Sequence, residues 1–437
     1  MTTYYLSTTG SDSNDGLSLA TAWLTFTKAL VTSGIPTTGG PHTLLVAAGT
    51  YAENTGGTGK LNITKAFGTM TTVQPLNPGS TVVITGTIGV ENIQINNTTT
   101  NLTFKNITFQ GRAGSTYVVH LYNNNGAITG LVFDTCSFID DAATSDMRNL
   151  YLEAYNASTI DCQCLNCTFT NGSNGVHAAV SLVGTATSNH TFTFTNCNMT
   201  IPLKTVAGID ARGGTFYFTN CNISAGRLPL EFGYDGTTTL VSTGYVKDSV
   251  FTSTGDHGLM IGQGADSVEV SNVVSSAAGH ALVLKGTNIS VKRSVFSGSG
   301  PLPAILFKGC QHANVSNCQV KVFAGSAIAN YDGVSSSGHG NSFTNNTVFV
   351  MPGSNGRVIG TWDLRGEDGT IPTVIDYNVY KPLPPQMYGV VLGSSLLQTI
   401  PALRAAWATY GDGSNDSHSR QYVPQQFVRL DERLIIF

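Results

Sequence analysis

The sequence predicts an all-β protein built as a parallel β-helix, a solenoid of about eleven or more coils of short strands. The first observation is a six-residue motif that recurs along most of the 437 residues. The second is the strict alternation of apolar and polar residues within that motif, with no competing helical period. The third is a composition with 41% hydrophobic but only 11% charged residues. Such a chain is too apolar to be disordered and needs a large ordered core.

The repeated motif reads as an apolar residue, two polar residues, a small or apolar residue, a polar residue and an apolar residue. Its copies span residues 104–109, 133–138, 164–169, 194–199, 218–223, 246–251, 291–296, 315–320 and 343–348. One such strand cannot bury its inner face alone, so the coils must stack. With strands ~4.8 Å apart, about eleven coils would form a rod ~50 Å long.

Two kinds of residue recur at fixed positions of the motif. The asparagine positions are Asn106, Asn166, Asn196, Asn220, Asn317 and Asn345. We expect them in left-handed turns or in stacks of side-chain amides. Five of the eight cysteines share the next position: Cys136, Cys167, Cys197, Cys221 and Cys318. We interpret these as buried thiols that fill a small inward slot, in preference to zinc ligands or disulfides.

The two ends of the chain are predicted to cap the open ends of the solenoid. We divide the chain into an N-terminal strand and capping helix (1–40), the β-helix (41–380) and a C-terminal cap and tail (381–437). Residues 17–34 have the spacing of an amphipathic helix that would seat Trp23, Phe26 and Leu30 on the first coil. Residues 396–410 show a similar helical spacing, which predicts a helical C-terminal cap.

Charge and hydropathy exclude two classes of partner. The formal net charge is only −4, so there is no general field to hold nucleic acid or an anionic membrane. No apolar run approaches the ~20 residues of a membrane span, and the first residues lack the features of a signal peptide. The Thr-, Ser- and Asn-rich composition predicts an extracellular or virion-surface location.

Both ends carry a resemblance to a known family. Residues 4–16, followed by Ala22-Trp23, 28–30 and 44–51, resemble the opening of right-handed parallel β-helix proteins of the pectate-lyase-like superfamily. Residues 376–380, 407–411 and 416–419 are similar to the ending of such chains, including chondroitinase-B-like polysaccharide lyases. The resemblance implies a right-handed β-helix and action on polysaccharides. The same fold carries glycosidases, esterases, phage tailspikes and structural proteins, so it does not fix the activity.

A second strand in each coil is expected to present outward side chains in two columns. The first column is predicted as His120, Tyr151, Ser181, Asp210, Glu231, Met260, Leu282 and Ile305. The second is predicted as Tyr122, Glu153, Val183, Arg212, Gly233, Gly262, Leu284 and Phe307. The N-terminal half of this face is thus predicted to be polar and aromatic, and the C-terminal half apolar.

The polar half predicts a site for glycoside hydrolysis. Asp210 and Glu231 would lie one coil apart, ~5 Å between Cα atoms, which raises the pKa of one carboxyl group through like-charge repulsion. We take Asp210, Glu231 and Glu153 as candidate catalytic residues, because such reactions need paired carboxyl groups. The residues predicted to hold the sugar rings are Arg212, His120, Tyr122 and Tyr151. The alternative is an ion-pair cluster without chemistry.

An alternative lyase site is centred on Lys285 and Lys308, which fall at equivalent strand ends of successive coils. Elimination from a uronic acid needs a base near the α-proton and positive charge near the carboxylate. His257, His280 and His312 are interpreted as turn caps.

The loop 10–16 has oxygen-bearing side chains at alternating positions but lacks the acidic residue that closes a calcium loop. We interpret it as a capping turn and keep calcium as an alternative. No other metal and no required cofactor are predicted.

The apolar half of the outward face predicts an oligomer. An exposed stripe of Met260, Leu282, Leu284, Ile305 and Phe307, with Tyr331, would mark a contact surface, and a homo-oligomer, with a trimer favoured, would bury it. Two functions therefore stay open. One is a polysaccharide hydrolase or lyase, and the other is a non-catalytic virion fibre, decoration protein or adhesin built on the same rod.

Overall fold

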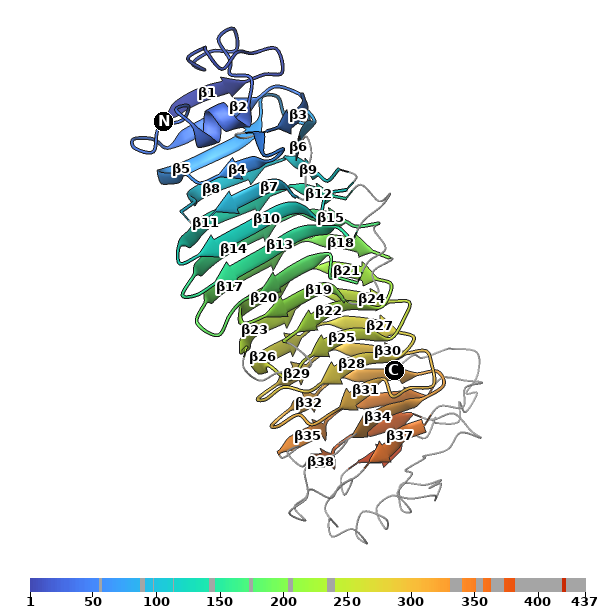
Figure 1. Cartoon of the computed structure of the whole chain (residues 1–437). Coiled ribbons are helices and arrows are strands. Elements are labelled where there is room, and N and C mark those ends of the chain that lie inside the picture. Colours follow the sequence, from blue (N-terminus) through green and yellow to red (C-terminus); the bar gives the residue numbers. More distant parts are fainter. Residues whose placement is uncertain are drawn as a thin grey trace, which may run out of the picture.

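The chain folds as a parallel β-helix, as the sequence predicts. The computed structural model describes residues 1–54, 57–86, 91–96, 98–112, 114–140, 146–172, 176–202, 207–233, 240–330, 340–350, 357–362, 373–381 and 419–421. Within these ranges the strands form three parallel sheets of 14, 14 and 12 strands, in which each strand pairs with its equivalents one coil before and one coil after. Figure 1 shows the coils stacked from the N-terminal end to the C-terminal end of an elongated body.

Each sheet takes one strand per coil. Sheet A contains β1 (Thr2–Leu6), β2 (His42–Val46), β5 (Ala66–Pro75), β8 (Thr100–Lys105), β11 (Ala127–Asp134), β14 (Thr159–Leu165), β17 (Asn189–Thr195), β20 (Gly214–Thr219), β23 (Ser242–Lys247), β26 (Ala265–Ser271), β29 (Ser290–Lys292), β32 (Asn314–Ser316), β35 (Asn341–Thr344) and β38 (Thr373–Asp376). Sheet B contains β3 (Gly49–Glu53), β6 (Val82–Gly86), β9 (Thr108–Gln110), β12 (Ser137–Ile139), β15 (Thr168–Thr170), β18 (Asn198–Ile201), β21 (Asn222–Ala225), β24 (Val250–Ser253), β27 (Val274–Ala277), β30 (Val295–Gly298), β33 (Gln319–Val322), β36 (Thr347–Val350), β39 (Val379–Lys381) and β40 (Arg420–Gln421). Sheet C contains β4 (Leu61–Ile63), β7 (Glu91–Asn96), β10 (Tyr117–Asn124), β13 (Arg148–Tyr155), β16 (Val180–Val183), β19 (Ala207–Arg212), β22 (Leu228–Phe232), β25 (His257–Ile261), β28 (His280–Leu284), β31 (Ile305–Phe307), β34 (Ser326–Asn330) and β37 (Arg357–Trp362).

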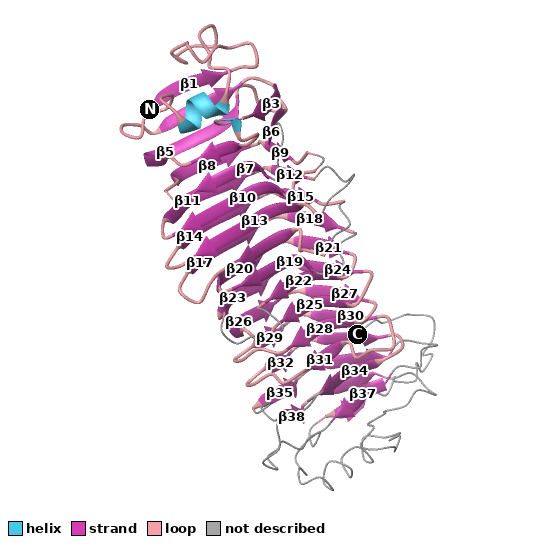
Figure 2. Ribbon diagram, in the orientation of Figure 1, coloured by secondary structure: helices cyan, strands magenta, loops and turns pink. Residues whose placement is uncertain are grey.

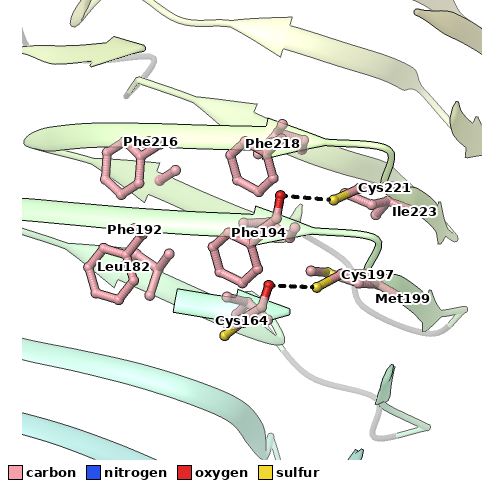
Figure 3. Close-up of a cluster of buried hydrophobic side chains, with 14 of the residues drawn as sticks. Cys164, Leu182, Phe192, Phe194, Cys197, Met199, Phe216, Phe218, Cys221 and Ile223 are labelled. Atoms are coloured by element: carbon pink, nitrogen blue, oxygen red, sulfur yellow. Dashed lines mark hydrogen bonds between the residues drawn. The ribbon is translucent and has the colours of Figure 1, made fainter. Parts of the chain in front are cut away.

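The interior of the rod is filled by side chains that stack from coil to coil. Phe194 and Phe218 occupy equivalent positions of β17 and β20, with ring centroids 5.1 Å apart and nearly parallel planes. Phe192 and Phe216 repeat this arrangement at 6.0 Å (Figure 3). Because each of these rings is fully buried, each contributes about 2–3 kcal/mol of hydrophobic free energy. The apolar positions of the motif therefore form one continuous core.

The turns between sheets A and B carry the predicted asparagine ladder. Backbone φ angles lie between 52° and 58° at all six predicted positions: Asn106, Asn166, Asn196, Asn220, Asn317 and Asn345. The Asn196 side-chain amide donates to Asn166 Oδ1 at 3.0 Å, and that of Asn220 donates to Asn196 Oδ1 at 2.8 Å. Asparagine is suited to both tasks, because it tolerates the left-handed region and carries a donor and an acceptor.

The cysteines are structural, as the sequence predicts. All eight are buried and free of disulfides. Cys197 Sγ donates to the carbonyl oxygen of Cys164 at 3.3 Å, and Cys221 Sγ donates to that of Phe194 at 3.5 Å (Figure 3). Burial raises the pKa of Cys318 to about 11, which keeps that thiol protonated at neutral pH. Where serine takes the same position, as at Ser249, its hydroxyl accepts the Cys221 backbone N–H at 3.0 Å.

The predicted N-terminal helix over residues 17–34 is wrong. Only Thr27–Val31 (η1) form a single turn of π-helix, shown as the helical ribbon at the N-terminal end in Figure 2. Ser18 and Thr21 bind each other in a local turn, which competes with helix formation. The predicted burial of Trp23 and Phe26 is confirmed, although these residues do not lie in a helix. The predicted helix over 396–410 lies outside the described residues.

The loop 10–16 has the geometry of a capping turn. Asp12 Oδ1 accepts the backbone N–H groups of Leu24 and Thr25 at 2.9 and 3.0 Å. Asp15 Oδ1 accepts the N–H of Leu17 at 3.0 Å, and this hydrogen bond lowers the pKa of Asp15. These carboxylates already have donors from the protein, and calcium at this loop stays a prediction. Among the described residues, no helix is long and apolar enough to cross a membrane.

Candidate functional site

The outer face of sheet C carries most of the ionisable side chains predicted to be functional. Strand pairing aligns one outward column as His120, Tyr151, Ser181, Asp210, Glu231 and Met260. A second column contains Tyr122, Glu153, Val183 and Arg212. The first column matches the sequence prediction as far as β25, and the second as far as β19.

Beyond β25 the predicted columns are wrong by one residue. Leu282 and Ile305 align with the inward Leu259, not with Met260. Leu282, Leu284, Ile305 and Phe307 are all 0% exposed and belong to the core. The prediction failed because β28 and β31 are apolar at consecutive positions, so alternation gives no inward direction.

The outward apolar surface is accordingly narrower than predicted. Met260, Val283 and Leu228 pack together outside the main core, with Leu306 against them. The predicted stripe residue Tyr331 lies outside the described residues. This small cluster lines a pocket and does not form a broad exposed stripe.

The N-terminal part of this face is a closed network around His120, which is 1% exposed. His120 Nε2 lies 3.0 Å from Glu153 Oε2, and Nδ1 lies 3.4 Å from Glu91 Oε1. Lys60 Nζ contacts Glu91 Oε2 at 2.7 Å. Burial alone would raise the pKa of Glu91, but its hydrogen bonds with His120 and Lys60 outweigh burial and lower it. Tyr155 donates its hydroxyl to Glu153, which raises the pKa of Tyr155 to about 12.

Stacked aromatic rings lie next to this network. The rings of Tyr117 and Tyr151 are parallel to within 11°, with centroids 4.4 Å apart. The guanidinium of Arg148 lies 4.3 Å from the Tyr151 ring centroid and 5.3 Å from that of Tyr117. This is a cation–π arrangement that holds both rings in place.

Asp210 and Glu231 are neighbours, as predicted, but they have different surroundings. The two residues are directly paired in β19 and β22, and each is 6% exposed. Asp210 accepts a hydrogen bond from Arg212 Nε. Burial raises the pKa of Asp210, against the opposing effect of Arg212 and Arg148. Asp210 is therefore tied to Arg212 on its own strand and influenced by Arg148 on β13, whereas Glu231 lines a pocket shared with the next coils.

Glu231 lines a pocket of about 350 Å³ on β22, β25, β28 and β31. Figure 1 shows these four strands as consecutive members of sheet C. The lining residues are Arg227, Leu228, Glu231, His257, Met260, His280, Val283, Lys285, Leu306 and Lys308. The pocket thus joins one residue of the predicted hydrolase site to both lysines of the predicted lyase site. Asp210, Glu153, His120, Tyr122, Tyr151 and Arg212 do not line it.

The two lysines are placed by strand register. Leu284 pairs with Phe307, so the residues that follow them, Lys285 and Lys308, lie at equivalent ends of β28 and β31. Arg227 adds a third basic side chain, and its Nε contacts Asp256 Oδ2 at 2.8 Å, which lowers the pKa of Asp256. Because Asp256 compensates the Arg227 charge, the positive charge of the lining comes from Lys285 and Lys308, with Glu231 as the acidic lining residue among the described residues.

His257 and His280 are functional candidates that sequence reasoning missed. They begin β25 and β28, pair with each other, and stack with ring centroids 5.1 Å apart, so their interpretation as turn caps is wrong. His280 Nδ1 donates to the carbonyl oxygen of Pro303 at 2.6 Å, which fixes the proton on Nδ1 and leaves Nε2 as the basic nitrogen. Both sequences read His, a small residue, then Leu, and this shared pattern is the signal that could have aligned them.

Both imidazoles are held in the neutral form. Burial lowers the pKa of His257 to about 4, and the neighbouring His280 adds to this effect. Burial also lowers the pKa of His280. A neutral, oriented imidazole beside ammonium groups can accept a proton from a bound molecule whose negative charge the ammonium groups hold. Within the described residues, no group of three His, Cys, Asp or Glu side chains is arranged to hold a metal ion.

Comparison with known proteins finds only distant structural likenesses. No family model matches the chain, and no curated protein matches it in sequence. A rhamnogalacturonan lyase structure aligns with 75% of this chain and 82% of its own length at 11% identity and a TM-score of 0.44. The GH136 lacto-N-biosidase from Eubacterium ramulus aligns with 96% of this chain and 68% of its own at 10% identity and a TM-score of 0.40.

A third solved structure, the A-module of an Azotobacter vinelandii mannuronan C-5 epimerase, aligns with 80% of this chain and 92% of its own at 12% identity and a TM-score of 0.39. Likenesses this distant say nothing of what this chain acts on.

Proposed function

We propose that the protein binds an acidic polysaccharide on the outer face of sheet C and cleaves it by β-elimination in the pocket that contains Lys285, Lys308 and His280. One observation carries the proposal. Three basic side chains and two neutral imidazoles line one pocket with an apolar floor formed by Met260 and Val283. An apolar floor fits the face of a sugar ring, and the basic groups fit its carboxylate.

The chemistry assigns a task to each group. Lys285 and Lys308 hold the carboxylate of a uronic acid and stabilise the negative charge that develops on it. His280 Nε2 takes the proton from the carbon next to the carboxylate. The electron pair of that C–H bond forms the C4=C5 double bond, and the glycosidic C4–O bond breaks. The departing oxygen takes a proton from Lys308 or water.

The neighbouring pair of Asp210 and Glu231 favours a second candidate, a glycoside hydrolase. Burial raises the pKa of Asp210, as a general acid requires, and Glu231 would act as base or nucleophile. We rank it second, because Asp210 binds Arg212 and does not line the pocket. The non-catalytic virion rod remains the alternative without an enzyme site. Extracellular or virion location, a homo-oligomer and calcium binding also remain predictions.

The test is incubation of the purified protein with a panel of acidic and neutral polysaccharides. Reducing ends and the ultraviolet absorbance of unsaturated uronates are read together. We expect both signals to appear on an acidic polysaccharide, and Lys285→Gln to raise KM by about tenfold or more, because it removes a charged contact. Lys321→Gln on the outer face of sheet B is the matched control, since it loses the same charge away from the pocket.

The competing functions give different results in the same assay. Reducing ends without absorbance, abolished by Asp210→Asn or Glu231→Gln, would replace the lyase with a hydrolase. No product on any polysaccharide, from a protein that unfolds cooperatively, would favour the non-catalytic rod.

A further inference from the structure

We propose that Tyr117 and Tyr151 form a second sugar-binding subsite, which holds a remote unit of the same acidic polysaccharide that the pocket cleaves. This inference rests on the proposed function and extends it from a pocket to a track along the rod. It also predicts a minimum length for a well-bound substrate.

The tyrosines of this face are gathered at one place. Among the described outward side chains of sheet C, tyrosines occur only on β10 and β13: Tyr117, Tyr122, Tyr151 and Tyr155. Tyr117 and Tyr151 are each partly exposed, so their rings are available at the surface. An aromatic ring offers an apolar face of the size of a pyranose ring, while its hydroxyl stays hydrated.

These rings are already fixed in one orientation. They stack at 4.4 Å, and the buried guanidinium of Arg148 lies against both. Binding of a ligand on these rings therefore loses little side-chain entropy, because the rings are already ordered. Arg148 also gives the platform a positive charge close to the rings, which suits an acidic sugar.

Strand register places the platform on the same track as the pocket. Tyr151 pairs with Ser181, Ser181 with Asp210, and Asp210 with Glu231, so three strand spacings separate Tyr151 from Glu231, ~14 Å. The residue next to Tyr151 on β16 is the small Ser181, which is only 7% exposed, so this column adds no bulky side chain directly after the platform. If the advance of each pyranose unit in an extended chain is taken as roughly one strand spacing, ~4.8 Å, a chain that reaches from Glu231 at the pocket to the platform needs about four sugar units.

The experiment measures binding and cleavage of size-graded oligogalacturonates and oligomannuronates by the full chain. We expect oligosaccharides of about six units to bind about fivefold to tenfold more tightly than those of two or three units. The variant Tyr151→Ala should lose this gain for the long oligosaccharides and leave binding of the short ones unchanged. Tyr151→Phe should retain it, because stacking needs the ring and not the hydroxyl.

Tyr245→Ala is the matched control, because Tyr245 is a tyrosine on the outer face of sheet A whose ring contacts that of Tyr217, with centroids 4.7 Å apart and a tilt of 37°. Thermal unfolding of each variant establishes that it is folded. If short oligosaccharides are cleaved but length dependence is absent, or is unchanged in Tyr151→Ala, the subsite is wrong and the pocket stands. If long oligosaccharides show the Tyr151-dependent gain but Lys285→Gln changes neither binding nor cleavage, the pocket is wrong and the platform alone binds sugar. If neither series binds or is cleaved at any length, both proposals are wrong for these uronates.

Discussion

Two ends of one sheet face differ in how their charges are arranged. On β7, β10 and β13, positive and negative groups satisfy one another, as Lys60, Glu91 and His120 do. On β22 to β31, Arg227, Lys285 and Lys308 share a pocket in which Glu231 is the one acidic lining residue among the described residues. A balanced buried network mainly holds itself together, whereas an excess of one sign favours a ligand of the opposite sign.

The histidines show the same contrast. His120 lies between two carboxylates, 3.4 Å from Glu91 Oε1 and 3.0 Å from Glu153 Oε2. His257 and His280 face each other and basic groups, and both have a lowered pKa. One region therefore uses histidine as part of a structural ion network, and the other presents histidine as a neutral base.

The largest expected effect is on catalysis by the pocket. His280→Gln removes the proposed base, so we expect kcat to fall by about 10²- to 10⁴-fold with little change in unfolding. Because burial lowers the pKa of His280 in the wild type, activity should persist at neutral pH and through the ordinary histidine pKa of about 6.5, and fall only at lower pH. The measurement is a pH profile of kcat/KM followed by uronate absorbance. An unchanged kcat in His280→Gln would show that the base lies elsewhere.

Acid should weaken the folded state through its neutral histidines. His190 is fully buried, neither ring nitrogen has a hydrogen-bond partner among the described residues, and burial lowers its pKa to about 4. Between pH about 6.5 and about 4 the unfolded chain binds protons that the folded His190 does not, so stability falls as the pH falls through this window. For His190 alone the loss is about 3 kcal/mol.

Denaturant unfolding at a series of pH values measures this loss. His190→Leu should remove most of it, because His190 aligns with Ile160 in an apolar column. The Glu91 network should weaken only at lower pH, because a lowered carboxyl pKa keeps its ion pairs down to that pKa. Equal acid sensitivity of wild type and His190→Leu would contradict the assignment.

A smaller effect is expected from breaking the N-terminal network. Glu91→Gln removes the partner shared by Lys60 and His120, so the free energy of unfolding should fall by about 1–3 kcal/mol. The kcat of the pocket should not change, because Glu91 does not line it. Thermal unfolding and kinetics on the same preparation test both statements. A large loss of kcat with intact stability would move the reaction to this end of the face.

The sequence was sufficient wherever apolar and polar residues alternate. The six-residue motif predicted the sheets, the asparagine turns and the cysteine ladder, because the alternation within each copy identifies which side chains face the core. Alternation also placed Asp210 and Glu231 side by side on the outer face. The helix prediction at 17–34 failed because helical spacing of apolar residues is not unique to helices. This segment forms turns, and its Trp23 and Phe26 are nevertheless buried in the core.

The pocket could be predicted only in pieces. Lys285 and Lys308 were found by their equivalent positions, but their direction depended on β28 and β31, whose consecutive apolar residues hide the inward side. His257 and His280 were missed because each stands where a turn becomes a strand, before the alternation begins. Strand register decides which residues of different coils become neighbours. Where a long connection separates two strands, the local sequence pattern does not predict their register.

The smallest expected effect is the response to salt, which should differ between substrate binding by the pocket and the stability of the Lys60–Glu91–His120 network. Raising the ionic strength from 0.1 to 1 M shortens the Debye length from ~10 Å to ~3 Å, and this screens the attraction between the pocket and an acidic chain. We expect KM to rise by about threefold to tenfold. The midpoint of thermal unfolding should change little, because the Lys60–Glu91–His120 network is largely buried and buried pairs are screened less. Stacking on the Tyr151 ring is not electrostatic in origin, so that part of the gain for long oligosaccharides should survive high salt, whereas the part contributed by the charge of Arg148 should be screened. If KM is the same at both ionic strengths, the basic side chains of the pocket do not bind the substrate's carboxylates.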